Sequence, residues 1–144
     1  AGPGFSYGGQ GRMNISHCTA LRNTADGINV GSECLVVDNV SMPNGGAGIR
    51  GTIGNTIKDN LSSRNVHGIQ LTPAFPSDNR VEGNNVVQNS SGGLKIESAG
   101  NLVIRNSAAA NGTNYDIIAG NAVGPLVTAA TIATSSNPHA NYDY

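Results

Sequence analysis

Arg50, Gln70 and Lys95 are polar residues that occupy the same position in a short phrase repeated along the chain. The phrase is a glycine, an aliphatic residue, the polar residue and a small or aliphatic residue. It begins at Gly27, Gly48, Gly68 and Gly93, with a fainter copy at Asp116. Side chains alternate between the two faces of a strand, so the polar residues point outward from it. Glu97, two residues after Lys95, adds a carboxylate on the same face. These side chains form a candidate ligand-binding strip.

An insertion beside this strip carries one of the chain's two phenylalanines. Leu71 to Val81 takes 10 residues, whereas the equivalent step from Val30 to Val36 takes 6, and the extra residues are 73–78. An aromatic ring next to planar hydrogen-bonding side chains is a common way for proteins to hold sugar rings. We therefore expect Phe75 to contact a sugar. The alternative is that Phe75 covers a sheet edge or joins a subunit contact.

Catalytic candidates are fewer. A glycosidase needs two carboxylates about 5 to 9.5 Å apart, and Asp38 and Asp59 share a position in neighbouring repeats. However, Asp before a turn commonly bonds its own backbone, and Lys58 stands alongside. His67, directly before a Gly turn, could act as a base with Arg50 or Lys95 nearby. A lone histidine at a turn can equally be a solvated side chain.

The sequence predicts neither a metal site nor a cofactor. A calcium-dependent lyase needs three or more clustered carboxylates and a base, whereas only Asp38 and Asp59 cluster. The histidines, His17, His67 and His139, fall in different regions and predict no metal site made of three histidines.

The elements that position these residues follow from the repeat. The phrase returns at steps of 21, 20, 25 and 23 residues, a period typical of solenoids. A second series of inward aliphatic residues precedes it, at Ile15, Val36, Ile57, Val81 and Val103. Three residues later a turn column runs through Cys18, Asn39, Asn60, Asn84 and Asn106. Another runs through Asn23, Asn44, Arg64 and Asn89, with Asn111 one place out of register. The outward residues of the phrase are Asn29, Arg50, Gln70, Lys95 and Ile118.

These columns predict an all-β chain, a single-stranded right-handed parallel β-helix of about five rungs over residues 1–120. Residues 121–144 are expected to form a C-terminal cap, with Tyr142 and Tyr144 folding back over the open end. Residues 1–11 are Gly-rich and poorly suited to capping, so an upstream domain or another subunit of a homo-oligomer would cover that end. Stacked Asn amides can bond one another or the bent backbone.

The Asn columns also bear on two other features of the sequence. N-x-Ser/Thr sites occur at Asn14, Asn39, Asn60, Asn89 and Asn111, and four of them coincide with the turn columns or lie one place beside them. We therefore interpret them as structural amides rather than glycan acceptors. Cys18 and Cys34 occupy different registers, about 15 Å apart along the ribbon, too far for a disulfide. We expect two buried free thiols.

Composition excludes several classes of function. The formal net charge is -1 and charged residues make up 12%, which gives no electrostatic case for nucleic acid or an anionic membrane. No stretch is long and apolar enough to span a bilayer. The 20 glycines and 19 asparagines favour turns over helices. The first residues lack the features of a signal peptide, so the signal of an exported protein would either have been removed or lie upstream of this chain.

The sequence resembles right-handed β-helix repeat proteins of bacteria within the pectate-lyase-like superfamily. The similar stretches are residues 100–106, 114–117, 120–125 and the closing Asn-Pro-His-Ala-Asn-Tyr. His139 stands where such proteins commonly carry Trp. The superfamily includes polysaccharide lyases, glycoside hydrolases, phage tailspikes and surface adhesins. The resemblance implies an extracellular or cell-surface protein, but fold analogy does not choose among these activities.

Three hypotheses follow. The first is a non-catalytic extracytoplasmic module that binds polysaccharide, or packs against another subunit, through Arg50, Gln70, Lys95, Glu97 and Phe75. The second is a lyase or hydrolase of an acidic glycan, in which Arg50, His67 and Lys95 handle the substrate. The third is a structural spacer.

Overall fold

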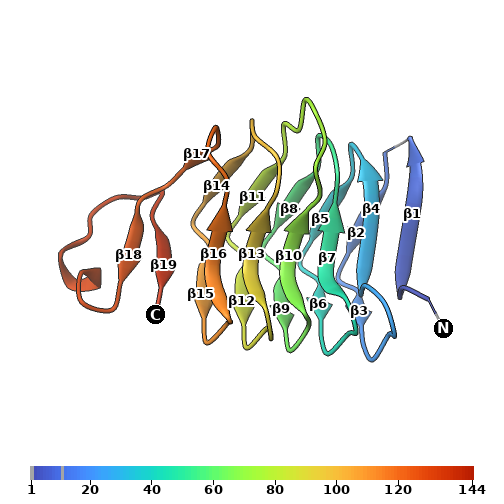
Figure 1. Cartoon of the computed structure of the whole chain (residues 1–144), viewed down its shortest axis with the longest axis horizontal. Helices are drawn as coiled ribbons and strands as arrows, with labels where there is room; N and C mark the ends of the chain where they lie inside the picture. The colour runs from blue at the N-terminus through green and yellow to red at the C-terminus, as the bar shows by residue number, and fades with distance from the viewer. Residues whose placement is uncertain (1, 11) are drawn as a thin grey trace.

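The computed structural model, which describes residues 2–10 and 12–144, shows a parallel β-solenoid of about five turns (Figure 1). Each turn contributes one strand to each of three parallel sheets, here called A, B and C. This confirms the predicted fold. In the described part of the chain, no helix has the length and apolar character needed to cross a membrane.

The strands are short and follow the sheets in order. Sheet A contains β1 (Phe5–Gln10), β4 (Ile28–Ser32), β7 (Ala47–Gly51), β10 (His67–Leu71), β13 (Gly92–Ile96) and β16 (Thr113–Ile117). Sheet B contains β2 (Asn14–Ser16), β5 (Leu35–Val37), β8 (Thr56–Lys58), β11 (Arg80–Glu82), β14 (Leu102–Ile104) and β17 (Ala122–Val123). Sheet C contains β3 (Thr19–Ala20), β6 (Val40–Ser41), β9 (Leu61–Ser63), β12 (Asn85–Val87), β15 (Ser107–Ala109), β19 (Asn141–Asp143) and β18 (Leu126–Thr128). A 3-10 turn spans Ile132–Thr134.

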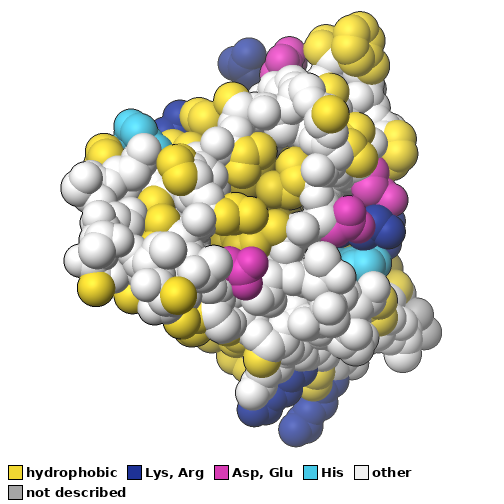
Figure 2. Space-filling view, turned by 60° about the vertical axis from the view of Figure 1, so that its left-hand side comes forward, with side chains coloured by type: hydrophobic (Ala, Val, Ile, Leu, Met, Phe, Trp, Pro, Cys, Tyr) yellow, Lys and Arg dark blue, Asp and Glu magenta, His cyan; other side chains and the backbone are white. Residues whose placement is uncertain are grey.

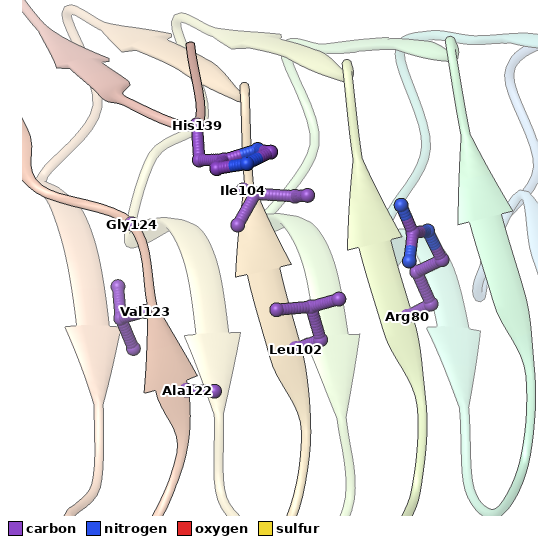
Figure 3. A pocket seen from close by; sticks show the side chains of 7 residues that line it. All are labelled: Arg80, Leu102, Ile104, Ala122, Val123, Gly124 and His139. Atoms are coloured by element: carbon purple, nitrogen blue, oxygen red, sulfur yellow. The ribbon is translucent and has the colours of Figure 1, made fainter. Parts of the chain in front are cut away.

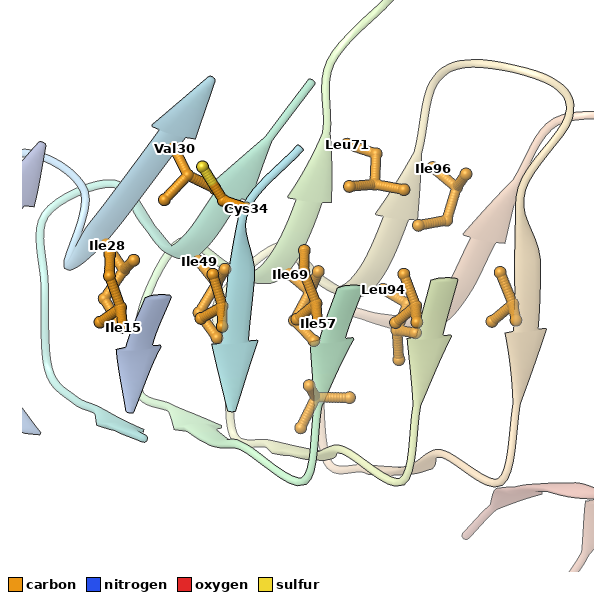
Figure 4. Packing of buried hydrophobic residues seen from close by; sticks show 14 of the residues in the cluster. Ile15, Ile28, Val30, Cys34, Ile49, Ile57, Ile69, Leu71, Leu94 and Ile96 are labelled. Carbon is orange, nitrogen blue, oxygen red and sulfur yellow. The ribbon is translucent and has the colours of Figure 1, made fainter. Parts of the chain in front are cut away.

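The core is built from the aliphatic columns that the repeat predicted (Figure 4). Ile28 pairs with Ile49, Ile49 with Ile69, and Ile69 with Leu94 in consecutive strands of sheet A. The second series, from Ile15 to Val103, stacks in sheet B in the same way. Burying each such side chain contributes about 1.5–3 kcal/mol.

Asparagines form three ladders, one at each corner of the coil. The first is the predicted column, in which Asn39, Asn60, Asn84 and Asn106 each bond the next, and it ends at Asn141. The second contains Asn65 rather than Arg64, so that prediction was wrong by one residue, and Asn111 belongs to it. The third, which the sequence analysis missed, runs through Asn55, Asn79, Asn101 and Asn121.

The residue before each ladder Asn commonly has a left-handed backbone. His17, Asp38 and Asp59 have φ of 56°, 54° and 55°, and Arg64 has φ 57°. A left-handed residue turns the chain sharply, and the following Asn then points inward to bond the backbone of the adjacent coil. Arg64 therefore shares the corner with Asn65 but faces solvent.

The two cysteines form no disulfide, as predicted, but Cys18 is half-buried rather than buried. Cys18 and Cys34 begin the first and third ladders, and the thiol of each donates to a carbonyl two residues earlier. The prediction of structural amides holds for four of the five N-x-Ser/Thr sites. Asn39, Asn60, Asn89 and Asn111 are ladder members, whereas Asn14 is exposed in β2. The side-chain amides of these four residues are used in hydrogen bonds within the ladders.

The two ends differ. At the N-terminus β1 adds a strand of sheet A beside β4, an element the sequence analysis did not include; Ala1 and Gly11 lie outside the described residues. At the C-terminus β19 inserts between β15 and β18, so the terminal segment extends sheet C (Figure 1). Tyr142 is half-buried in β19, whereas Tyr144 is exposed.

Candidate functional site

The outer face of sheet A carries the predicted strip. Arg50, Gln70 and Lys95 pair directly in β7, β10 and β13, and Asn29 precedes them in β4. The next member is Asp116, because Leu94 pairs with Tyr115 and Lys95 with Asp116. The expectation that Ile118 closes this column was therefore wrong. The side chains of Tyr115, Asp116 and Ile117 alternate between the two faces of β16, as in the earlier repeats. The difference is that Tyr115, an aromatic residue, takes the inward position that Leu94 has in the previous coil.

The cations of the strip are already paired. Arg50 holds Asp26 through two contacts, Nε to Oδ2 at 2.7 Å and NH2 to Oδ1 at 3.2 Å. Asp26 also accepts a bond from the Ala47 amide at 2.7 Å, which fixes it at the start of β7. Lys95 lies 3.4 Å from Glu97. The face is therefore not basic, because each cation of the strip is paired with a carboxylate.

Glu97 connects Gln70 and Lys95 of the strip. Its Oε2 accepts a bond from Gln70 Nε2 at 2.7 Å, and its Oε1 faces Lys95. Burial opposes ionisation of Glu97, but the bonds from Gln70 and Lys95 and the Lys95 charge outweigh it, so its pKa lies below the usual range. Glu97 is thus a carboxylate at neutral pH, and it orients the Gln70 amide.

His67 begins β10 and stands beside the strip. Its Nδ1 is buried and, among the residues that the structure describes, has no hydrogen-bond partner; the same holds for Gln70 Oε1. Burial lowers the pKa of His67, and Lys95 and then Arg50 lower it further. Glu97 and Asp116 act in the opposite direction without reversing the shift. His67 is consequently a neutral imidazole at pH 7.

A titration of His67 is expected to give a pKa below its ordinary value of 6.5. The folded state then binds fewer protons than the unfolded state between the two pKa values, so this residue's contribution to stability is lost as the pH falls below 6.5. Lys95→Gln removes a nearby cation and should raise the His67 pKa, whereas Lys58→Gln, on another face, should not. The imidazole Cε1–H resonance reports both, and a pKa of 6.5 or above would contradict this assignment.

Phe75 lies in the loop between β10 and β11, which follows the strip residue Gln70 by a few positions (Figure 1). Its side chain is 91% exposed. The loop itself is anchored, because Ser77 is buried and bonds Ser98, and Asn79 belongs to the third ladder. A fixed loop therefore presents a bare aromatic ring to solvent.

The other catalytic candidates lie elsewhere. Asp38 and Asp59 occupy the left-handed corner between sheets B and C, where Asp38 faces His17 at 3.7 Å and Asp59 faces Lys58 at 3.4 Å. Asp and Asn are favoured at such backbone positions, which explains their column. The structure does not bring them to the strip on sheet A.

One charged cluster on sheet B was missed by sequence reasoning. Glu82, whose side chain is only 7% exposed, accepts from Arg80 Nε at 2.6 Å and Arg105 NH1 at 3.0 Å. The Arg80 hydrogen bond, above all, lowers the pKa of Glu82. The Arg80-Val81-Glu82 alternation was the available signal, since it places both charges outward on one strand. Figure 2 shows basic and acidic side chains gathered in several small groups rather than one broad field.

Comparison with known families identifies the chain's relatives. A family model described as periplasmic copper-binding protein (NosD) matches residues 2–130. The chain belongs to the NosD family. This is a family of right-handed parallel β-helices, in agreement with the fold. No curated protein and no solved structure matched the chain.

The description of the NosD family raises the question of copper. Copper favours imidazole, thiolate and thioether ligands. No group of three or more His, Cys, Asp or Glu side chains able to hold a metal occurs among the described residues. His67 lies in β10, whereas His17 follows β2 and His139 lies in the terminal segment. Among the described residues, the His, Cys, Asp and Glu side chains therefore do not assemble into a copper centre.

Proposed function

We propose that this NosD-family chain is an extracytoplasmic, non-catalytic module that binds polysaccharide along the outer face of sheet A. The observation that carries the proposal is the fully displayed ring of Phe75 in the loop that leaves the end of β10, the strand carrying Gln70. Coils repeat about every 4.8 Å, which spaces planar donors regularly along the solenoid. Sugar rings are held by such combinations of aromatic and hydrogen-bonding groups. The periplasmic description of the family supports the location.

The charge pairing favours a neutral glycan. Arg50 and Lys95 each face a carboxylate of the protein, so an acidic sugar would have to displace Asp26 or Glu97 and leave it unpaired. A neutral sugar can bond to the edges of these pairs without breaking them. The rival reading, an enzyme acting on an acidic glycan, has less support because His67 Nδ1 is buried and the cations are committed.

Phe75→Ala is expected to weaken binding to a neutral polysaccharide by about three- to tenfold, because an aromatic contact contributes roughly 0.5–1.5 kcal/mol. Affinity gel electrophoresis against a panel of neutral glucans, xylan and polygalacturonate measures this. Tyr144→Ala is the matched control, since Tyr144 is also an exposed aromatic but belongs to the C-terminal segment.

The same samples distinguish the alternatives. The proposal requires retardation by a neutral polymer that Phe75→Ala reduces and Tyr144→Ala preserves, without new reducing ends or unsaturated products. Product formation from polygalacturonate, lost in His67→Ala, would establish the enzyme instead. Absence of both binding and products would leave the spacer.

A further inference from the structure

A second surface of interest is an apolar pocket on the outer face of sheet B. It is a solvent-open hollow of about 400 Å³, and this volume lies within the usual range for small-molecule sites. Leu102 and Ile104 of β14 form its floor, and Ala122, Val123 and Gly124 form one side. Arg80 and His139 stand at its rim, and Figure 3 shows the His139 side chain above Ile104. The pocket shares no residue with the strip on sheet A.

The pocket arises from a change in side-chain size along sheet B. Arg80 pairs with Leu102, and Leu102 pairs with Ala122, so a large outward side chain is followed by a methyl group. Gly124 continues the small side of the hollow. The terminal segment supplies the opposite wall, because Arg105 Nε holds the Pro138 carbonyl at 2.9 Å. A Cβ on Gly124 would overlap the His139 carbonyl, so this contact also depends on glycine.

The rim carries excess positive charge. Glu82 is the one carboxylate between two guanidinium groups, Arg80 and Arg105. Arg80 uses Nε for Glu82, and among the described residues its two terminal nitrogens have no hydrogen-bond partner. Its side chain is partly exposed. The terminal N–H groups of Arg80 can therefore donate hydrogen bonds to an anionic group of a ligand that lies on the apolar floor.

We propose that this pocket binds a free medium-chain carboxylate. The alkyl chain lies over Leu102 and Ile104, and the carboxylate bonds the terminal nitrogens of Arg80 with His139 alongside. The aliphatic lining favours a ligand with an alkyl chain, because removing the apolar surface of that alkyl chain from water drives binding. The single net positive charge of the rim selects a monoanion over an alcohol of equal length. This proposal is independent of polysaccharide binding.

The test uses sodium octanoate and the whole chain, with binding followed by amide chemical shifts. Saturable shifts centred on Leu102, Ile104 and Ala122 are expected. Octan-1-ol, which lacks the charge, should bind about three- to fivefold more weakly than octanoate. Butyrate, whose alkyl chain is four carbons shorter, should bind more weakly still. Shifts spread over the surface, equal shifts with octan-1-ol, or no saturation would overturn the proposal.

Variants separate the two parts of the site. Leu102→Glu places a carboxylate on the floor and should reduce octanoate affinity about tenfold or more. Leu35→Glu is its matched control, because Leu35 is an exposed leucine in the same outward column of sheet B. Arg80→Gln should reduce affinity about three- to fivefold. Arg12→Gln, another arginine paired with a glutamate, should not, and equal losses in variant and control would refute the site.

Discussion

Replacing Asn84 with alanine is expected to lower the free energy of unfolding by about 3–5 kcal/mol, because several buried groups lose their partners together. Asn84 is 1% exposed. Its Oδ1 accepts from the Asn60 backbone at 3.0 Å and side chain at 2.9 Å. Its Nδ2 donates to the Ile57 carbonyl at 2.9 Å and to Asn106 at 3.0 Å. Alanine supplies none of these groups.

Asn85→Ala is the matched control, because Asn85 is the next residue but is exposed on β12. Its side chain accepts a 3.3 Å hydrogen bond from Ser107 Oγ, so a change within about 0.5 kcal/mol is expected. Urea unfolding followed by circular dichroism measures both variants. Asn84→Asp keeps the acceptor but loses the donor, and should also be strongly destabilised. Equal stability of Asn84→Ala and Asn85→Ala would show that the ladder contributes little.

The ladders show how far the sequence predicts this fold. The first was read directly, since Asn39, Asn60 and Asn84 follow the inward aliphatic residues at a fixed distance. The third was equally periodic, since Asn55, Asn79 and Asn101 each stand two residues before those same aliphatic residues. It could have been found by aligning on sheet B. Cys34 at its head, and the insertion before Asn79, hid the repeat.

The candidate site was predicted less completely, for a physical reason. Strand alternation places Arg50, Gln70 and Lys95 on one face whatever their rotamers, and the register confirms it. Which charges pair depends instead on side-chain reach between coils. Asp26 precedes its strand by two residues, yet it binds Arg50 of the next coil. The pairing of Arg50 and Lys95 with carboxylates of the protein could therefore be seen only in the three-dimensional structure.

Gly48→Ala is expected to destabilise the protein by about 3 kcal/mol or more, because one methyl group has no space at this position. An added Cβ would overlap Ser62 Oγ and come within 2.6 Å of Asn65 Nδ2 and 2.9 Å of the Gly68 carbonyl. Backbone freedom is not the cause, since Gly48 is not one of the described glycines with positive φ, which are Gly54, Gly83, Gly100 and Gly120. Urea unfolding measures the loss.

This result would explain why the glycine phrase is the strongest repeat in the sequence. Ser62 Oγ bonds the Gly68 carbonyl at 2.7 Å, and Ser41 bonds the Gly48 carbonyl at 2.8 Å, so a serine of sheet C reaches the strand start of sheet A in each case. An added side chain at Gly48 would occupy the space of Ser62, and one at Gly27 would occupy the space of Ser41. The serine contact accounts for Gly27 and Gly48. At all four glycines of the phrase, an added Cβ would also come within 3.0 Å of a ladder Asn Nδ2 and of a backbone carbonyl of the next coil.

Two variants test that cause rather than the loss alone. Gly51→Ala is the milder control, because its Cβ would meet Asn55 Nδ2 at 3.1 Å and other atoms at 3.4 Å or beyond. Adding Ser62→Ala to Gly48→Ala removes the nearest obstacle. A double-mutant cycle should then give a favourable coupling of about 1 kcal/mol or more. Additive losses would mean that Ser62 is not the obstacle, and the glycine column would need another explanation.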